Sequence, residues 1–305
     1  MADAKILRIY LDETPLVRAQ RGNFNLINKI IKVFEASEYR VELKRNSAAE
    51  RAKSADRRGY SLFHMDEPFH ERALTLRKAY YYPFWRIENS EKRWEWSIAK
   101  ARFEPGAIPN AESVAFCDFW RRNLFKTFDE LEPNQGIVYV PLQGRLLEQR
   151  SFQTASPLAM IEQVLHHDRH RQVVVSLHPG EAYVPDETDA LKALVSRHPR
   201  LSLSSEPMEA LLTQCDYVAT ENSSVALAGY FFHKPAVLFA RIDFHHIAAN
   251  VAELGTAEAI RAAPGLKPEY DKYLCWFLRH TAINGGSEKA EAQILEAVRR
   301  HGWNL

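Results

Sequence analysis

Short apolar segments alternate with helix-like segments from about residue 134 to residue 240, and this alternation constrains the fold more than any other feature of the chain. The apolar segments are "GIVYVPL", "RQVVVSLHP", "RLSLSS", "DYVAT" and "PAVLFA". Segments such as "PLAMIEQVLHHD" and "ETDALKALVSRH" lie between them and carry apolar residues at helical spacing. This pattern predicts a parallel β-sheet with helices on both faces, in which ligands bind at the carboxyl ends of the strands.

The chain begins with a second pattern of the same kind. "KILRIYLDE", "NFNLINKIIKVFEAS" and "YRVELKR" read as strand, helix and strand. Residues 59–105 are dense in aromatic and charged residues without a clean period, which predicts an irregular and partly exposed surface. A chain of 305 residues exceeds the usual single core. We therefore expect an N-terminal domain over 1–125, a C-terminal domain over 126–285, and a last helix in 286–305 that packs back on the first domain.

Charge, cysteine content and hydropathy indicate which partners and which compartment to expect. The 40 basic and 39 acidic residues nearly cancel, which gives no argument for binding nucleic acid. Cys117, Cys215 and Cys275 lie far apart in apolar surroundings, so we expect buried thiols in a reducing compartment. No segment offers 18 uncharged apolar residues. These features predict a cytoplasmic protein and leave room for peripheral contact with a membrane.

Three of the expected strands end in unusual polar residues. The residues at these exits are Gln143, Arg145, His178, Pro179, Glu221, Asn222, Ser223 and Ser224. Loops at the carboxyl ends of neighbouring parallel strands lie side by side, so we expect His178 and the two serines to converge. A serine at a helix N-terminus presents a hydroxyl and free backbone N–H groups, and phosphate is the expected anion there. Read individually, Ser223 is a helix cap and His178 is a hydrogen-bonded structural residue.

The segments "VPLQ", "SPLAMIEQVL", "VVVSLHPGE" and "LLTQCDYVATENSSVALAGYFFHKPAVLF" together resemble the bacterial capsule polysaccharide biosynthesis glycosyltransferases, which include the Kdo transferases. They are also similar at motif level to two-domain bacterial sialyltransferases of the GT-B kind, which share an HP motif and a Ser-Ser motif. The resemblance covers residues 134–245 and implies a GT-B-like fold of two Rossmann-like domains. It assigns the phosphate of a CMP-sugar donor to His178, Ser223 and Ser224, and the base and ribose to Glu206.

The sequence offers two sources for the catalytic group. In retaining transferases of this kind a carboxylate follows the strand-end glutamine by four residues, but Leu147 stands there and Glu148 is one step further. Either Glu148 substitutes for it, or a general base comes from the N-terminal half. The base candidates at strand ends there are Asp12, Glu13, His64 and Asp66. Trp85, Arg86 and Arg93 lie in an aromatic, basic run that suits an anionic acceptor, or else a core or a dimer contact.

The resemblance implies a metal-independent glycosyltransferase that moves a sugar from a nucleotide-activated donor to a bacterial surface polysaccharide or glycolipid. We expect a CMP-linked acidic sugar such as Kdo or sialic acid, and no cofactor. No DxD metal motif, P-loop or GxGxxG is present. The alternatives are a UDP- or GDP-sugar enzyme, an epimerase-like enzyme, or a non-catalytic nucleotide-sugar-binding partner in polysaccharide assembly.

Overall fold

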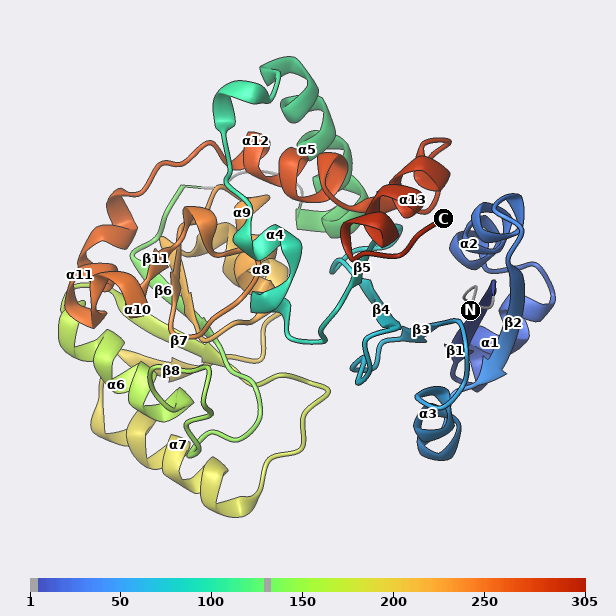
Figure 1. Cartoon of the computed structure of the whole chain (residues 1–305). Coiled ribbons are helices and arrows are strands. Elements are labelled where there is room, and N and C mark those ends of the chain that lie inside the picture. Colours follow the sequence, from blue (N-terminus) through green and yellow to red (C-terminus); the bar gives the residue numbers. More distant parts are fainter. Residues whose placement is uncertain (1–4, 129–132) are drawn as a thin grey trace. The chain divides into compact units, whose positions relative to one another are not determined.

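The computed structural model describes residues 5–128 and 133–305. The chain divides into two compact units. Unit 1 comprises Met1–Ala101 and Phe277–Leu305, and unit 2 comprises Arg102–Trp276. Each unit contains one six-stranded, mostly parallel sheet with helices packed on it (Figure 1). The predicted α/β fold of two Rossmann-like domains is therefore confirmed.

Unit 1 has the strand order β12-β5-β4-β3-β1-β2. Its strands are β1 (Ile6–Leu11), β2 (Arg40–Arg45), β3 (Tyr60–His64), β4 (Ala73–Lys78), β5 (Phe84–Glu88) and β12 (Ile283–Asn284). Its helices are α1 (Glu13–Gln20), α2 (Asn25–Ala36), α3 (Ala48–Ser54), α4 (Ser97–Lys100) and α13 (Ala290–Arg300). Strands β1 to β4 run parallel, whereas β5 pairs antiparallel with β4 and β12 pairs antiparallel with β5.

The main core of unit 1 lies between its sheet and helices α2 and α13. Ile27 and Ile30 of α2 pack with Ile9 of β1 and with Ile294 and Val298 of α13, and all five side chains are fully buried. Spacings of three and four residues place each pair on one helix face. Burial of one such aliphatic side chain contributes about 1.5–3 kcal/mol to folding, so this face fixes where the helices dock.

The expectation of an irregular surface over residues 59–105 is wrong, because β3, β4 and β5 lie there and form the middle of the sheet. Every residue of β5 is buried, including two charged ones. Arg86 donates to the carbonyl oxygen of Phe277 at 2.7 Å, and Glu88 lies 3.4 Å from Nε2 of His301. Charges that are buried with partners interrupt the apolar alternation by which a strand is recognised in a sequence.

Unit 2 has the strand order β11-β10-β9-β6-β7-β8, and all its strands are parallel. The strands are β6 (Ile137–Pro141), β7 (Gln172–Ser176), β8 (Leu201–Leu203), β9 (Tyr217–Thr220), β10 (Ala236–Leu238) and β11 (Ala249–Asn250). The helices are α5 (Asn110–Phe125), α6 (Pro157–His167), α7 (Pro185–Arg197), α8 (Met208–Gln214), α9 (Ser224–Tyr230), α10 (Val251–Leu254), α11 (Thr256–Ala262) and α12 (Tyr270–Leu274). The five strands predicted from residue 134 onward are confirmed as β6 to β10.

Helices cover both faces of the unit 2 sheet. Val173 and Val175 of β7 pack with Ile161 of α6 and Leu191 of α7, while α8 and α9 pack against β6 and β9. Strands buried on both faces are expected to be apolar along their whole length, which is the pattern of "VVV" in β7. The strong strand signal in this half of the sequence therefore comes from burial on two sides.

In both sheets the order of strands reverses beside the first strand of the unit. Strand β6 lies between β7 and β9, and β1 lies between β2 and β3. In a doubly wound sheet, loops that leave such neighbouring strands diverge to opposite faces and open a crevice at the carboxyl ends. These two strand ends are therefore the places where ligands are expected.

The compact units divide at residues other than those suggested by the sequence. The expected boundaries followed residues 125 and 285, whereas the units change after Ala101 and after Trp276. Helix α5 belongs to unit 2, and the chain re-enters unit 1 within a π-helical turn, Cys275–His280, that continues α12. Helix α13 packs against α2 in unit 1.

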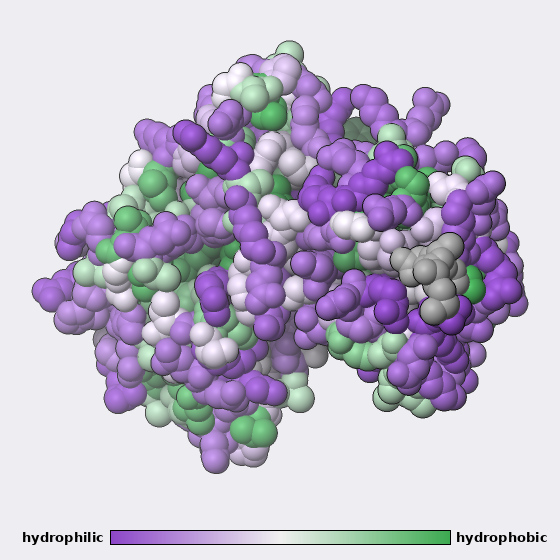
Figure 2. Space-filling model, in the orientation of Figure 1, coloured by the Kyte–Doolittle hydropathy of each residue, from purple (hydrophilic) through white to green (hydrophobic). Residues whose placement is uncertain are grey.

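The cysteines and the surface carry two further findings. All three cysteines are buried, and burial raises the pKa of Cys215 to about 12, so this thiol is protonated at neutral pH. Figure 2 shows hydrophilic residues over most of the visible face and hydrophobic residues in small groups. Over the part of the chain that the structure describes, no helix is both long enough and apolar enough to span a bilayer.

Candidate functional site

A cavity of about 520 Å³ lies at the carboxyl edge of the unit 2 sheet. Residues that follow four neighbouring strands line it. Among them are Gln143 after β6, His178 and Pro179 after β7, Glu206 after β8, and Ser223 and Ser224 after β9. The imidazole and the serine pair, distant in sequence, therefore line one cavity at the point where the strand order reverses.

The His178 side chain is oriented by its own loop. Its Nδ1 accepts the backbone N–H of Gly180 at 3.0 Å, so the proton of the neutral ring is on Nε2. The backbone N–H of His178 donates to the Tyr183 hydroxyl at 2.8 Å. A Cβ atom on Gly180 would lie 3.1 Å from Cε1 of the ring, a spacing that favours glycine there. Nε2 is thereby left as a hydrogen-bond donor for a ligand.

The two serines have different surroundings. Ser223 is the N-cap of α9, is 4% exposed, and accepts the backbone N–H of Val225 at 3.3 Å through its hydroxyl. It therefore does cap its helix, as the alternative interpretation expected. Ser224 is exposed and lines the same cavity. The Ser224 hydroxyl is thus the freer of the two to meet a ligand.

The lining of the cavity is rich in hydroxyl groups and poor in positive charge. Among the described residues that line it, none is Lys or Arg, and Glu206 and Glu209 bring carboxylates. The Tyr139 hydroxyl lies 2.8 Å from Oγ of Ser176, and burial raises the pKa of Tyr139 to about 12, so the phenol stays neutral. An anion in this cavity would be bound by hydrogen bonds from neutral groups.

Glu221 is not among the residues that line the cavity. Its side chain is 2% exposed, and Oε2 lies 3.5 Å from Nη2 of Arg150. Burial raises the pKa of Glu221 to about 7, against the opposing effect of the Arg150 charge. Its neighbour Asn222 is half-buried and also lies outside the lining. Glu221 therefore supports the loop that carries Arg150.

This carboxyl group makes the stability of the chain depend on pH. The folded state binds the Glu221 proton more tightly than the unfolded state, so the contribution is full below about pH 4.5 and is lost as the pH rises through about 7. In the wild type, the free energy of unfolding is expected to fall by about 3 kcal/mol as the pH rises through this range. We expect this fall to be absent in Glu221→Gln. Urea unfolding of both proteins at pH 5 and pH 8 measures it. Parallel declines in wild type and variant would contradict the assignment.

Arg145 and Glu148 pair with each other at the surface. Both oxygens of Glu148 lie 3.3 Å from Nη1 of Arg145, and the two side chains are 54% and 65% exposed. Neither lines the cavity, and Arg145 has a positive φ of 63°. Leu147, which stands where the resembling enzymes have a carboxylate, is 53% exposed.

In unit 1 the carboxyl edge of the sheet brings two of the predicted base candidates together. Nδ2 of Asn46 donates to Oδ1 of Asp12 at 2.8 Å and to Oδ2 of Asp66 at 2.5 Å. Asp66 is also paired with Nη1 of Arg51 at 2.7 Å, whereas Asp12 is exposed. Asp12 is the N-cap residue of α1, yet its side chain makes no cap hydrogen bond. Its carboxylate is turned to Asn46 instead.

The other two base candidates differ from this pair. Burial lowers the pKa of His64, whose ring packs near Phe24 and Trp85, so the imidazole is neutral at pH 7. Glu13 is exposed and pairs with Arg45 at 2.9 Å. Glu13 therefore forms a surface ion pair, and His64 is a half-buried neutral group beside Asp12 and Asp66.

The residues predicted to bind the acceptor pack within unit 1. Trp85 and Arg86 are each 4% exposed. The guanidinium of Arg93 lies over the Tyr80 and Trp96 rings, at 4.2 and 4.6 Å from their centroids. Trp85 and Arg86 therefore offer little surface to a ligand, as the core alternative expected.

Several residues of the two sites belong to no recognisable sequence motif and were not predicted. In unit 1 these residues are Asn46 and Arg51, which contact the Asp12 and Asp66 carboxylates. In unit 2 they are Tyr139, Ser176 and Glu209, which line the cavity. Asn46 directly follows a strand, so the search of strand ends could have found it. The others depend on contacts between segments distant in the chain.

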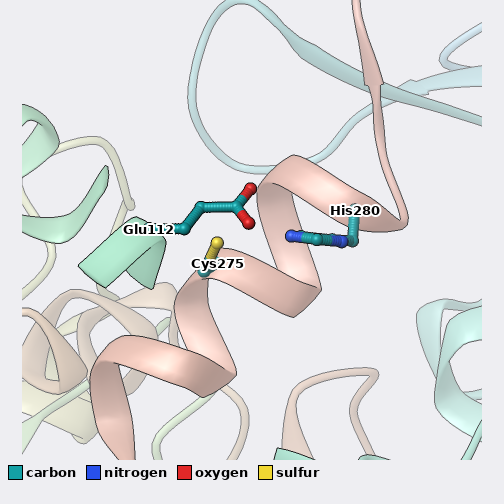
Figure 3. A group of neighbouring side chains, drawn as sticks. All are labelled: Glu112, Cys275 and His280. Carbon is teal, nitrogen blue, oxygen red and sulfur yellow. The ribbon is translucent and has the colours of Figure 1, made fainter. Parts of the chain in front are cut away.

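Figure 3 shows three side chains that offer metal-ligating atoms. A carboxylate oxygen of Glu112 and Sγ of Cys275 lie within 4.8 Å of each other, and both residues belong to unit 2. His280 belongs to unit 1, and we assign no metal site to residues of different units.

Comparison with known proteins adds information on the fold. No family model matches the chain, and no curated protein sequence matches it. The beta Kdo 2,7 transferase of KpsC from Thermosulfurimonas dismutans is similar in structure, at 14% identity and a TM-score of 0.54 over 96% of this chain and 99% of that chain. The beta Kdo 2,4 transferase of the same KpsC gives 9% identity and a TM-score of 0.44, over 87% and 88% of the chains.

A UDP-GlcNAc 2-epimerase from Neisseria meningitidis is also similar, at 9% identity and a TM-score of 0.37 over 97% of this chain and 99% of that chain. The TM-scores of 0.44 and 0.37 are too low to establish a common fold. The likeness to the beta Kdo 2,7 transferase shows that this chain has a GT-B-like fold, and at 14% identity it shows the fold alone.

Proposed function

We propose that the chain is a glycosyltransferase that moves a sugar from a CMP-linked donor to a bacterial surface polysaccharide or glycolipid. In this proposal unit 2 binds the donor and unit 1 binds the acceptor. The sugar is an acidic one such as Kdo or sialic acid, and catalysis requires no metal ion. The protein acts in the cytoplasm, with peripheral contact to the inner membrane where its acceptor is a glycolipid.

The single observation that carries the proposal is the shared cavity of His178, Ser223 and Ser224. Nε2–H of His178 and the Ser224 hydroxyl are donors that suit the phosphate of a nucleotide sugar. When the bond from the sugar to the phosphate breaks, negative charge grows on the phosphate oxygen. A donor already aimed at that oxygen stabilises the transition state without reorganisation.

The charge of the cavity favours a monophosphate donor over a diphosphate. A diphosphate adds a second negative charge, and burying it requires cationic partners or a metal ion. The described lining has no Lys or Arg and has two carboxylates, Glu206 and Glu209. In a CMP-linked acidic sugar the second negative charge is the carboxylate of the sugar, apart from the phosphate. The neutral donors of the lining therefore have a single phosphate charge to satisfy. This argument supports CMP over UDP or GDP.

We propose Asp12 as the general base for the acceptor hydroxyl. It is exposed, and its carboxylate accepts a hydrogen bond from Asn46, whereas Asp66 is also paired with Arg51 and Glu13 with Arg45. A base has to have a free oxygen within hydrogen-bond reach of the proton that it takes. The proton of the acceptor passes to Asp12, and CMP leaves with the electron pair of the broken bond.

Titration calorimetry with CMP, UDP and GDP tests the donor assignment. We expect CMP to bind, UDP and GDP to bind at least about tenfold more weakly, and Ser224→Ala to weaken CMP binding. Ser196→Ala, a substitution of a serine on the surface of α7, is the matched control and leaves binding unchanged. Binding of UDP without CMP would remove the CMP assignment and favour the UDP-sugar alternatives. Binding of CMP with no sugar transfer to extracted acceptor would favour the non-catalytic partner.

A further inference from the structure

Glu187, in the first turn of α7, connects two loops that are far apart in the chain. Its Oε1 accepts the backbone N–H of Leu146 at 2.6 Å, and its Oε2 accepts the backbone N–H of Val184 at 3.1 Å. The side chain is part of a residue only 7% exposed. Both carboxylate oxygens are therefore used, and each is bound to a different loop.

Both loops bring residues to the cavity of unit 2. Residues 142–156 follow β6 and carry Gln143, and residues 177–184 follow β7 and carry His178. The loops also touch directly, since a Cβ atom on Gly144 would lie 2.6 Å from Oε2 of Glu181.

Hydrogen bonds within the loop of residues 177–184 connect Val184 to the backbone of His178. Val184, which donates to Glu187, is the neighbour of Tyr183, and the Tyr183 hydroxyl accepts the backbone N–H of His178 at 2.8 Å. A displacement of residue 184 would therefore move the backbone that carries His178.

Helix capping explains only half of this arrangement. A glutamate at the third position of a helix commonly accepts the N–H of the N-cap residue, and the bond to Val184 is of this kind. The bond to Leu146 spans 41 residues and belongs to no cap. It is the shorter of the two, and hydrogen bonds to a charged acceptor are about twice as strong as neutral ones.

We propose that Glu187 is a positioning residue for donor binding, which holds the loops of Gln143 and His178 at a fixed separation across the cavity. This inference rests on the proposed function. Glutamate suits the role because an ionised carboxylate offers two acceptor oxygens and no donor. Glutamine in its place would turn an NH₂ group toward one of the two backbone N–H groups, and that loop would be released.

The test is a double-mutant cycle on CMP affinity, with Glu187→Gln and His178→Ala alone and combined. We expect Glu187→Gln to raise the Kd for CMP by about tenfold, and to have a much smaller effect when His178 is already absent. Asp186→Asn is the matched control, because Asp186 is the adjacent exposed acid in the same helical turn and makes neither loop contact. Hydrogen exchange of the Leu146 and Val184 amides, measured without nucleotide, is expected to accelerate in Glu187→Gln only.

The outcomes separate this inference from the proposed function. A Kd equal to that of wild type, or an equal loss with and without His178, overturns the positioning role. Unchanged exchange of both amides overturns it as well, whether or not a nucleotide binds. Failure of the wild-type chain to bind CMP, UDP and GDP overturns the proposed function itself.

Discussion

His178→Ala is expected to lower the rate of sugar transfer by about 10²–10³-fold, the loss typical when one preorganised donor to a developing negative charge is removed. The backbone N–H of Gly180 binds Nδ1 of the ring and leaves Nε2–H as a donor, and His178 lines the same cavity as Ser224. In the proposed reaction the charge on the phosphate grows as the donor sugar departs, so the loss is expected mainly in kcat. Release of CMP in the presence of extracted acceptor measures it.

The control for this variant is His198→Ala, which removes a histidine at the end of α7, outside the cavity lining. It is expected to keep the wild-type rate. A His178→Ala protein that binds CMP normally and transfers sugar at the wild-type rate would remove His178 from the mechanism. Loss of CMP affinity alone, with kcat unchanged, would instead limit His178 to ground-state binding.

Asp168→Ala is expected to lower the free energy of unfolding by about 3–5 kcal/mol, because it removes the buried acceptor of four hydrogen bonds, one of which comes from the buried Tyr217 hydroxyl. Asp168 is 6% exposed and accepts the backbone N–H groups of His170 and Arg171, each at 3.2 Å. Its other oxygen accepts Nη1 of Arg171 at 3.0 Å and the Tyr217 hydroxyl at 3.1 Å. Urea unfolding at pH 7 measures the loss.

The pH dependence of this loss gives a second check. Burial by itself would raise the pKa of Asp168, but the backbone N–H and guanidinium of Arg171 outweigh it and hold the pKa below its ordinary value. The stabilisation is thus present above about pH 4 and is lost as the pH falls through the lowered pKa. Asp189→Ala, at an exposed aspartate of α7, is expected to change stability by less than about 0.5 kcal/mol. Equal losses in the two variants would contradict this account of Asp168.

Much of unit 2 could be predicted from the sequence because its strands are apolar on both faces and its helices are amphipathic. "VVV" in β7 and the helical spacing in α6 are local signals, and each survives in the folded chain. The rule that ligands gather at strand ends then brought His178, Ser223 and Ser224 together without any contact being known. The strands of unit 1 were harder to predict, because β5 contains two buried charged residues, Arg86 and Glu88.

The positions of polar side chains within the site could not be predicted in the same way. Glu221 precedes the serine pair in sequence, yet it is buried with Arg150 and does not line the cavity. Asp12 and Asp66 are 54 residues apart, and Asn46 joins them only after three strands have aligned. Glu187 reads as an ordinary helix-start residue until its bond to Leu146 is seen.

The sequence alone determined the alternation of strands and helices, and with it the edge of the sheet at which a ligand is expected. Periodicity is a property of neighbouring residues, so a fold built from repeated strand-helix units can be recognised from it. Only the tertiary structure decided which polar groups form hydrogen bonds or ion pairs with one another. The partner of a buried carboxylate, as Arg150 is for Glu221 or Leu146 for Glu187, comes from another strand exit. No local pattern records that choice, because it depends on how separate loops pack.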